Sequence, residues 1–140
     1  MGSVITMDWK LEVIPVPVAD VDRAKAFYAD QLGFAVDLDV ELAPGRRLIQ
    51  LTPPGSGCSI HLGNGNAEAS PGPIRGLQLV VADIESARAH LVDATVDVSP
   101  VRKFEGGEWR DGHGGRWNAF LFFDDTDGNG WVVQERPSNE

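Results

Sequence analysis

One nine-residue pattern occurs twice in this chain, and it constrains the fold more than any other feature. It reads VADVDRAKA at residues 18–26 and VADIESARA at residues 81–89, without gaps and at a constant offset of 63 residues. Each copy follows an apolar segment, at residues 11–18 and 74–81, that is rich in Val, Ile and Leu and short enough to be a β-strand. The sequence therefore predicts two copies of one structural unit, each beginning with a strand.

Each repeat is expected to continue as a helix. Asp20 and Asp83 stand where N-caps belong, because a carboxylate there accepts hydrogen bonds from the first free N–H groups and faces the positive end of the helix dipole. Gly33 is placed to end the first helix. Side chains at helical spacing form a mainly apolar stripe on each helix, at Val21, Ala24, Tyr28 and Gln31, with Phe27 beside them, and at Ile84, Ala87, Leu91 and Ala94.

Further strands are predicted after each helix. They lie at residues 36–40, 47–52 and 58–62 in the first copy, and at 96–99, 117–123 and 131–135 in the second. Residues 100–116 are expected to form a long Gly-rich loop. We therefore predict an α+β fold in one domain (residues 1–140), with a first βαβββ module at 10–62, a linker at 63–73 and a second module at 74–136.

Composition restricts the class of partner. The net charge of −9 opposes binding to nucleic acid and to anionic membranes. It suits a neutral or cationic small ligand, or else serves solubility alone. No apolar run approaches the ~20 residues of a membrane span, and the N-terminus lacks the features of a secretory signal. Cys58 is the only cysteine, so an internal disulfide is impossible. We expect a cytoplasmic protein.

Several spaced motifs resemble the vicinal oxygen chelate superfamily, which includes glyoxalase I, the bleomycin-resistance proteins and the extradiol dioxygenases. The motifs are residues 16–24, Phe27-Tyr28, Leu32-Gly33-Phe34, and Asp125-Thr126-Asp127-Gly128-Asn129, which stands for the family's Asp-Pro-Asp-Gly-Asn turn. The resemblance implies tandem βαβββ modules that form a curled mixed sheet around a cavity, usually completed by a second subunit in a homodimer. In the enzymes, one residue on the first and one on the last strand of each module bind a divalent metal.

The four positions that the resemblance assigns to metal ligands are mostly apolar in this chain. They fall on Val13, Gly76, Val132 and His61, and only His61 carries a ligand-capable side chain. A catalytic site of this kind needs about three protein ligands. Gln78 shares the face of Gly76 but leaves the set incomplete, and Glu12 would reach the cavity only if the strand register slipped by one residue. We therefore expect neither a metal nor another cofactor.

The same cavity would hold the ligand-contacting residues. His61 is expected to act as a hydrogen-bond partner or a general base, or else to be a strand histidine satisfied by a neighbour. Trp109 and Trp117 could stack on a flat ligand, or pack in the core or a dimer contact. The sequence leaves open whether Phe120 and Phe122 lie on the same face of the sheet as Val132, and so whether they line the cavity. The predicted ligand-binding residues are His61, Gln50, Gln78, Phe104, Trp109, Trp117, Phe120 and Phe122.

These observations favour a binding protein without a metal that sequesters a hydrophobic, aromatic small molecule such as an antibiotic. The alternative is an enzyme of the same superfamily, a lyase, isomerase or dioxygenase-type enzyme that uses displaced metal ligands or His61. A third possibility is a partner-binding module whose cavity is filled by its own side chains.

Overall fold

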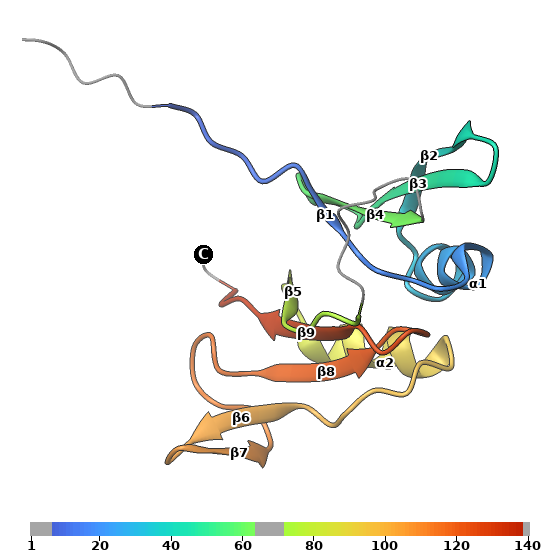
Figure 1. Ribbon diagram of the computed structural model, residues 1–140. Helices are drawn as coiled ribbons and strands as arrows, with labels where there is room; N and C mark the ends of the chain where they lie inside the picture. Colours follow the sequence, from blue (N-terminus) through green and yellow to red (C-terminus); the bar gives the residue numbers. More distant parts are fainter. Residues whose placement is uncertain (1–6, 64–71, 139–140) are drawn as a thin grey trace, which may run out of the picture.

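The computed structural model describes residues 7–63 and 72–138, and most of the predicted linker, residues 64–71, lies outside this described part. Within it the chain forms two β-sheets, each accompanied by a helix (Figure 1). Sheet 1 contains β1 (Val13–Pro15), β2 (Ala35–Ala43), β3 (Arg46–Thr52) and β4 (Ser59–Gly63). Sheet 2 contains β5 (Leu77–Val81), β6 (Arg102–Glu105), β7 (Glu108–Asp111), β8 (Phe120–Asp124) and β9 (Gly130–Glu135). The helical elements are α1 (Val21–Ala26), the π-helical turn η1 (Phe27–Gln31) and α2 (Ile84–Asp93).

The two sheets repeat one topology. The strand order is β1-β4-β3-β2 in sheet 1 and β5-β9-β8-β6-β7 in sheet 2. In both, the first strand pairs in parallel with the last, and the remaining pairs are antiparallel. The helix after the first strand makes the crossover that a parallel pair requires. This confirms the predicted α+β fold with tandem units. None of the helices among the described residues is long and apolar enough to cross a membrane.

The predicted N-caps are confirmed. The side chain of Asp20 accepts a hydrogen bond from the backbone N–H of Arg23 at 3.1 Å, and Asp83 accepts from Ser86 at 3.2 Å. Gly33 follows the first helical segment with a φ of +84°, a conformation that favours glycine. The helix itself differs from the prediction, because regular α-helix ends at Ala26 and a π-helical turn follows.

Three predictions for the second unit were wrong. Residues 96–99 form no strand, and only Val98 makes a single bridge, to Phe123. The strand predicted from Trp117 begins at Phe120. The predicted loop at 100–116 contains the hairpin β6–β7. Its turn is formed by Gly106 and Gly107, with φ values of +63° and +80°, as a two-residue turn with left-handed backbone at both positions requires.

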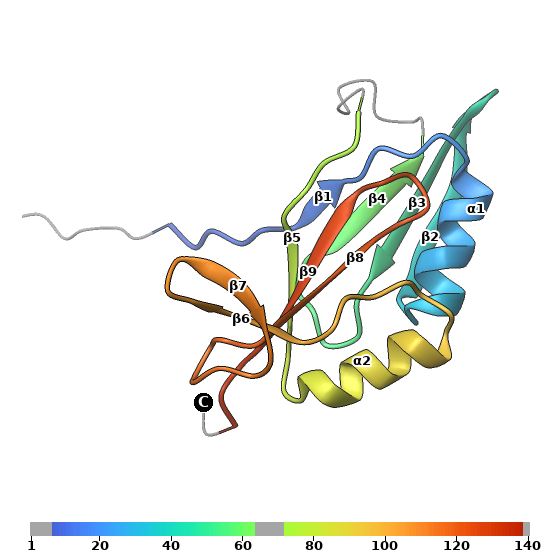
Figure 2. The same ribbon diagram turned by 90° about the horizontal axis from the view of Figure 1, so that it is seen from below.

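The helix-bearing faces of both sheets share one hydrophobic core. Phe27 and Tyr28 from the first unit contact Phe123 and Trp131 from the second, with ring centroids 6.3 Å and 5.8 Å apart. Each ring is almost completely buried. Because one core joins the units, most of the helix-side face of each sheet is filled by packed side chains. Figure 2 shows α1 and α2 along the same side of the strands.

A buried polar cluster also fastens the second unit to the first. The Tyr28 hydroxyl donates to Asp125 at 2.5 Å and accepts from the Trp131 indole N–H at 2.9 Å. Asn129 donates to the same carboxylate at 2.8 Å and to the carbonyl of Pro17 at 2.9 Å. Burial, and the bond to Asp125, raise the pKa of Tyr28 well above its ordinary value. The Asp125–Asn129 turn therefore joins the second unit to the first through buried hydrogen bonds.

Candidate functional site

The strand register settles which residues of sheet 2 face away from the core. Phe122 pairs with Val132, and Phe120 pairs with Gln134, so these four side chains share one face. The alternating residues, which include Trp131, are buried on the helix side. Phe120 and Phe122 therefore lie with Val132 on what we call the open face of sheet 2. The strand register thus decides which face of β8 carries Phe120 and Phe122, a question that the sequence left open.

An aromatic cluster covers this open face. The Trp109 ring meets Phe120 and Phe122 edge-on, with centroids 5.1 Å from each, and meets Phe104 at 5.2 Å. Strand β6 stands between β7 and β8 in the sheet, so the Trp109 ring reaches across it. Phe104 and Trp109 remain 49% and 47% exposed although they are large and apolar. Exposed aromatic surface gathered in one place is typical of a binding site.

Hydrogen bonds hold the surroundings of this cluster. Asn118 accepts from the backbone N–H of Phe104 at 2.8 Å and donates to its carbonyl at 3.0 Å, which fixes the hairpin. Gln78 donates to Gln134 at 2.7 Å, and Gln134 donates to the Trp117 carbonyl at 2.8 Å. Trp117 is 44% exposed and has a φ of +62°. Its backbone carbonyl is bound to Gln134 on the open face. Its ring takes no part in the ring contacts described for the cluster.

The face of sheet 1 that is turned away from the core, its open face, carries a polar row, with the apolar side chains of Leu38 and Val40 on the neighbouring strand β2. Gln50 and His61 pair across β3 and β4, and His61 Nε2 lies 2.9 Å from Gln50 Oε1. Gln50 Nε2 lies 3.4 Å from the Ser59 hydroxyl, which is 2.6 Å from the Thr52 hydroxyl. Thr52 in turn donates to the Asp37 carboxylate. Five side chains from three strands thus form one continuous hydrogen-bonded row.

The predicted site residues consequently form two groups on two sheets. His61 and Gln50 lie on sheet 1, whereas the aromatic cluster and Gln78 lie on sheet 2. The opposite faces of both sheets pack in the shared core, so each group lies on the outer face of its own sheet. Within one chain, the polar and aromatic groups do not face each other across the core.

The side chains present do not fit the metal that the fold family implies. The parallel registers Pro15–His61 and Gln78–Val132 confirm that His61 and Val132 occupy equivalent positions on the last strands. Val132 and Val13 offer no donor atom, and Gly76 has no side chain. Among the described residues, no three His, Cys, Asp or Glu side chains are grouped closely enough to hold a metal ion.

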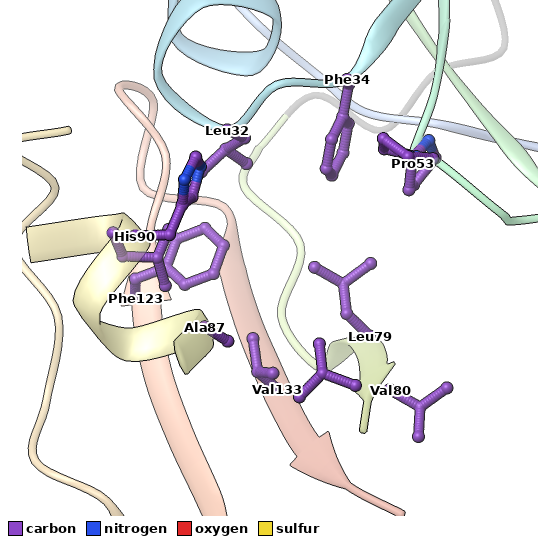
Figure 3. A pocket seen from close by; sticks show the side chains of 12 residues that line it. Leu32, Phe34, Pro53, Leu79, Val80, Ala87, His90, Phe123 and Val133 are labelled. Atoms are coloured by element: carbon purple, nitrogen blue, oxygen red, sulfur yellow. The ribbon is translucent and has the colours of Figure 1, made fainter. Parts of the chain in front are cut away.

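A separate cavity of about 220 Å³ lies between the two units (Figure 3). Its walls are apolar and include Leu32, Phe34, Leu79 and Phe123. His90 also lines it and is exposed. The cavity contains none of the predicted ligand-binding residues.

Sequence reasoning missed the residues that support His61 and Gln78. Ser59 and Asp37 complete the polar row, and Gln134 links Gln78 to the loop before β8. Strand parity could have found Ser59, because it lies two residues before His61. Asp37 could not be found in this way, because a register irregularity between Val36 and Leu38 breaks the alternation of β2.

Comparison with known proteins identifies relatives by sequence and by fold. The family model for the Glyoxalase/Bleomycin resistance protein/Dioxygenase superfamily matches residues 10–133. No curated protein matches the chain significantly.

Solved structures match nearly the whole chain. TnmS3, an antibiotic binding protein from Streptomyces sp. CB03234, is 26% identical, with a TM-score of 0.73 over 94% of this chain and 99% of its own. A glyoxalase/bleomycin resistance protein from the same organism is 28% identical, with a TM-score of 0.69 over 89% and 99%. A superfamily member from Sphaerobacter thermophilus DSM 20745 is 25% identical, with a TM-score of 0.71 over 94% and 100%. The chain therefore belongs to the glyoxalase/bleomycin resistance/dioxygenase superfamily.

Proposed function

Since the chain belongs to this superfamily, we propose that it binds and sequesters a flat, hydrophobic aromatic small molecule, such as an antibiotic, without a metal. The observation that carries the proposal is the aromatic cluster on the open face of sheet 2, in which Phe104 and Trp109 are about half exposed and Phe120 and Phe122 are partly buried. Flat ligands gain affinity by covering such rings, since apolar burial contributes about 25 cal/mol per Å². The likeness to an antibiotic binding protein supports the same class of ligand.

We further propose that each binding cavity is formed by two copies of the chain. The polar row that contains His61 and the aromatic cluster that contains Trp109 lie on outer faces within one chain. A homodimer that sets sheet 1 of one copy against sheet 2 of the other would bring the two groups together. The resulting cavity would have one aromatic wall and one hydrogen-bonding wall, as small-molecule sites typically do.

Titration with a panel of aromatic antibiotics, followed by tryptophan fluorescence, tests the proposed binding. Trp109 is the intended reporter, because a ligand on the open face would contact its ring. We expect a saturable change that is largely lost in Trp109→Phe and kept in Trp9→Phe, whose indole is 83% exposed on the N-terminal segment. A panel without any saturable response would contradict the proposal.

An enzyme is the second candidate, and His61 is the observation in its favour. Its imidazole is only partly buried and is held by Gln50, as a positioned base would be. Metal analysis of the purified protein separates the metal-dependent form of this alternative. Stoichiometric zinc, nickel or iron would overturn the metal-free proposal.

A further inference from the structure

The polar row on sheet 1 has a definite direction, and this direction begins at Asp37. A carboxylate only accepts hydrogen bonds, so the Thr52 hydroxyl must donate its proton to Asp37. The Thr52 oxygen is then left as the acceptor toward Ser59. Since the two hydroxyl oxygens are 2.6 Å apart, a proton must lie between them, and it comes from Ser59.

The same logic passes through Gln50 to His61. The Ser59 hydroxyl already donates its single proton to Thr52, so toward Gln50 it can only accept a hydrogen bond. Gln50 must therefore turn its NH₂ group toward Ser59 and its oxygen toward His61. An amide oxygen accepts, so His61 must carry a proton on Nε2, which lies 2.9 Å away.

In the neutral imidazole, a proton on Nε2 leaves Nδ1 as an acceptor. The Nδ1 atom has no hydrogen-bond partner in the part of the chain that the structure describes, and the ring is partly exposed on the open face. We infer that Asp37, acting through Thr52, Ser59 and Gln50, keeps the proton of His61 on Nε2 and leaves Nδ1 free to accept a hydrogen bond. The site would therefore select aromatic ligands that donate a hydrogen bond, such as phenols. The ligand selectivity rests on the proposed function, whereas the position of the proton on His61 does not.

Asp37 is a positioning residue in this scheme, since it contacts neither His61 nor the ligand. Asp37→Asn would no longer fix the direction of the hydrogen bonds along the row, because an amide can donate to Thr52 as well as accept from it. Asp37 is exposed, so this variant is expected to fold. Glu41→Gln is a matched control on the same strand, because the Glu41 side chain accepts from Gly45 outside the row.

Two measurements test the inference separately. Long-range ¹H–¹⁵N correlation spectra of the free protein, at a pH where imidazoles are neutral, report which nitrogen of His61 carries the proton. The chain has three histidines, so a His61→Gln variant assigns the signal. We expect the Nε2–H form in the parent and in Glu41→Gln, and a mixture of forms in Asp37→Asn. A parent protein in the Nδ1–H form would overturn the inference.

The second measurement compares hydroxypyrene with methoxypyrene by fluorescence anisotropy. One neutral hydrogen bond is worth about 1 kcal/mol, so hydroxypyrene should bind about fivefold more tightly. Asp37→Asn should reduce this preference and Glu41→Gln should preserve it. Equal affinity of the parent for both pyrenes would overturn the selectivity. Binding of neither, with the Nε2–H form confirmed, would overturn the proposed function and the selectivity with it, leaving only the orientation of His61.

Discussion

Tyr28 is the side chain on which the junction between the two units depends most directly. Its hydroxyl donates to Asp125 and accepts from Trp131, and all three groups are buried. Removing the hydroxyl would leave the Trp131 indole N–H without its partner inside the core and would take one hydrogen bond from the Asp125 carboxylate, which keeps those from Asn129. Because a buried hydrogen bond to a charged group contributes about 1.5 to 3 kcal/mol, Tyr28→Phe should lower the free energy of unfolding by about 2 kcal/mol.

Urea denaturation measures this loss, and Thr126→Val serves as its control. Thr126 lies in the same turn, but among the described residues its hydroxyl reaches only Asp127, at 3.4 Å. Its replacement should change the free energy of unfolding by less than about 0.5 kcal/mol. An equally small effect of Tyr28→Phe would show that the buried cluster does not fasten the units.

His113 gives the fold a weak dependence on pH. Its Nε2 lies 2.6 Å from Glu135, whose other oxygen accepts from the first N–H of α2, at Ile84. The bond to Glu135, together with that to the Gly114 carbonyl, raises the pKa of His113. The bond from Ile84, and then that from His113, lowers the pKa of Glu135.

The sign of the dependence follows from these directions. A raised histidine pKa gives stability that is fully present below the unfolded-state pKa and is lost as the pH rises through the folded-state pKa. The His113 side chain is 46% exposed, so the contribution should stay within about 1 kcal/mol. Urea denaturation at a series of pH values should show the loss in the parent and not in His113→Gln. Identical profiles for the two proteins would contradict this account.

At the scale of elements, the hairpin β6–β7 is what makes the aromatic surface. It carries Phe104 and Trp109 over the side chains of Phe120 and Phe122. Trp109→Ala should therefore weaken binding of an aromatic probe such as hydroxypyrene by about tenfold or more, since aromatic anchors commonly contribute above about 1.4 kcal/mol. Anisotropy titration measures the change, and Trp9→Ala should bind as the parent does. A Trp109→Ala protein with parental affinity would place the ligand elsewhere.

The elements also show where sequence reasoning succeeds and where it stops. The repeat located both N-caps and most strands, because local capping and alternation determine them. The hairpin was missed although Gly106-Gly107 between Phe104 and Trp109 is a hairpin signal, because the Gly-rich composition around it favours a loop. The row from Asp37 to His61 was beyond reach, since it depends on a register irregularity and on pairing across three strands.

At the scale of the whole molecule, the arrangement of the sheets predicts the assembly. The polar and aromatic groups lie on outer faces, so the proposed cavity would need a second copy of the chain. Sedimentation velocity should therefore show a dimer at micromolar concentration. A protein that stays monomeric while binding an aromatic ligand would contradict the shared cavity.

Complementation between two defective variants tests the central claim most directly. His61→Ala damages only the sheet 1 wall, and Trp109→Ala damages only the sheet 2 wall. In a mixed dimer, the intact sheet 1 of one chain would meet the intact sheet 2 of the other and restore one cavity. Unfolding and refolding the variants together should thus give about one quarter of the parental number of sites with parental affinity for hydroxypyrene, while each variant alone shows only the weakened affinity. If the mixture binds no better than the separate variants, the ligand cavity is not shared between two copies of the chain.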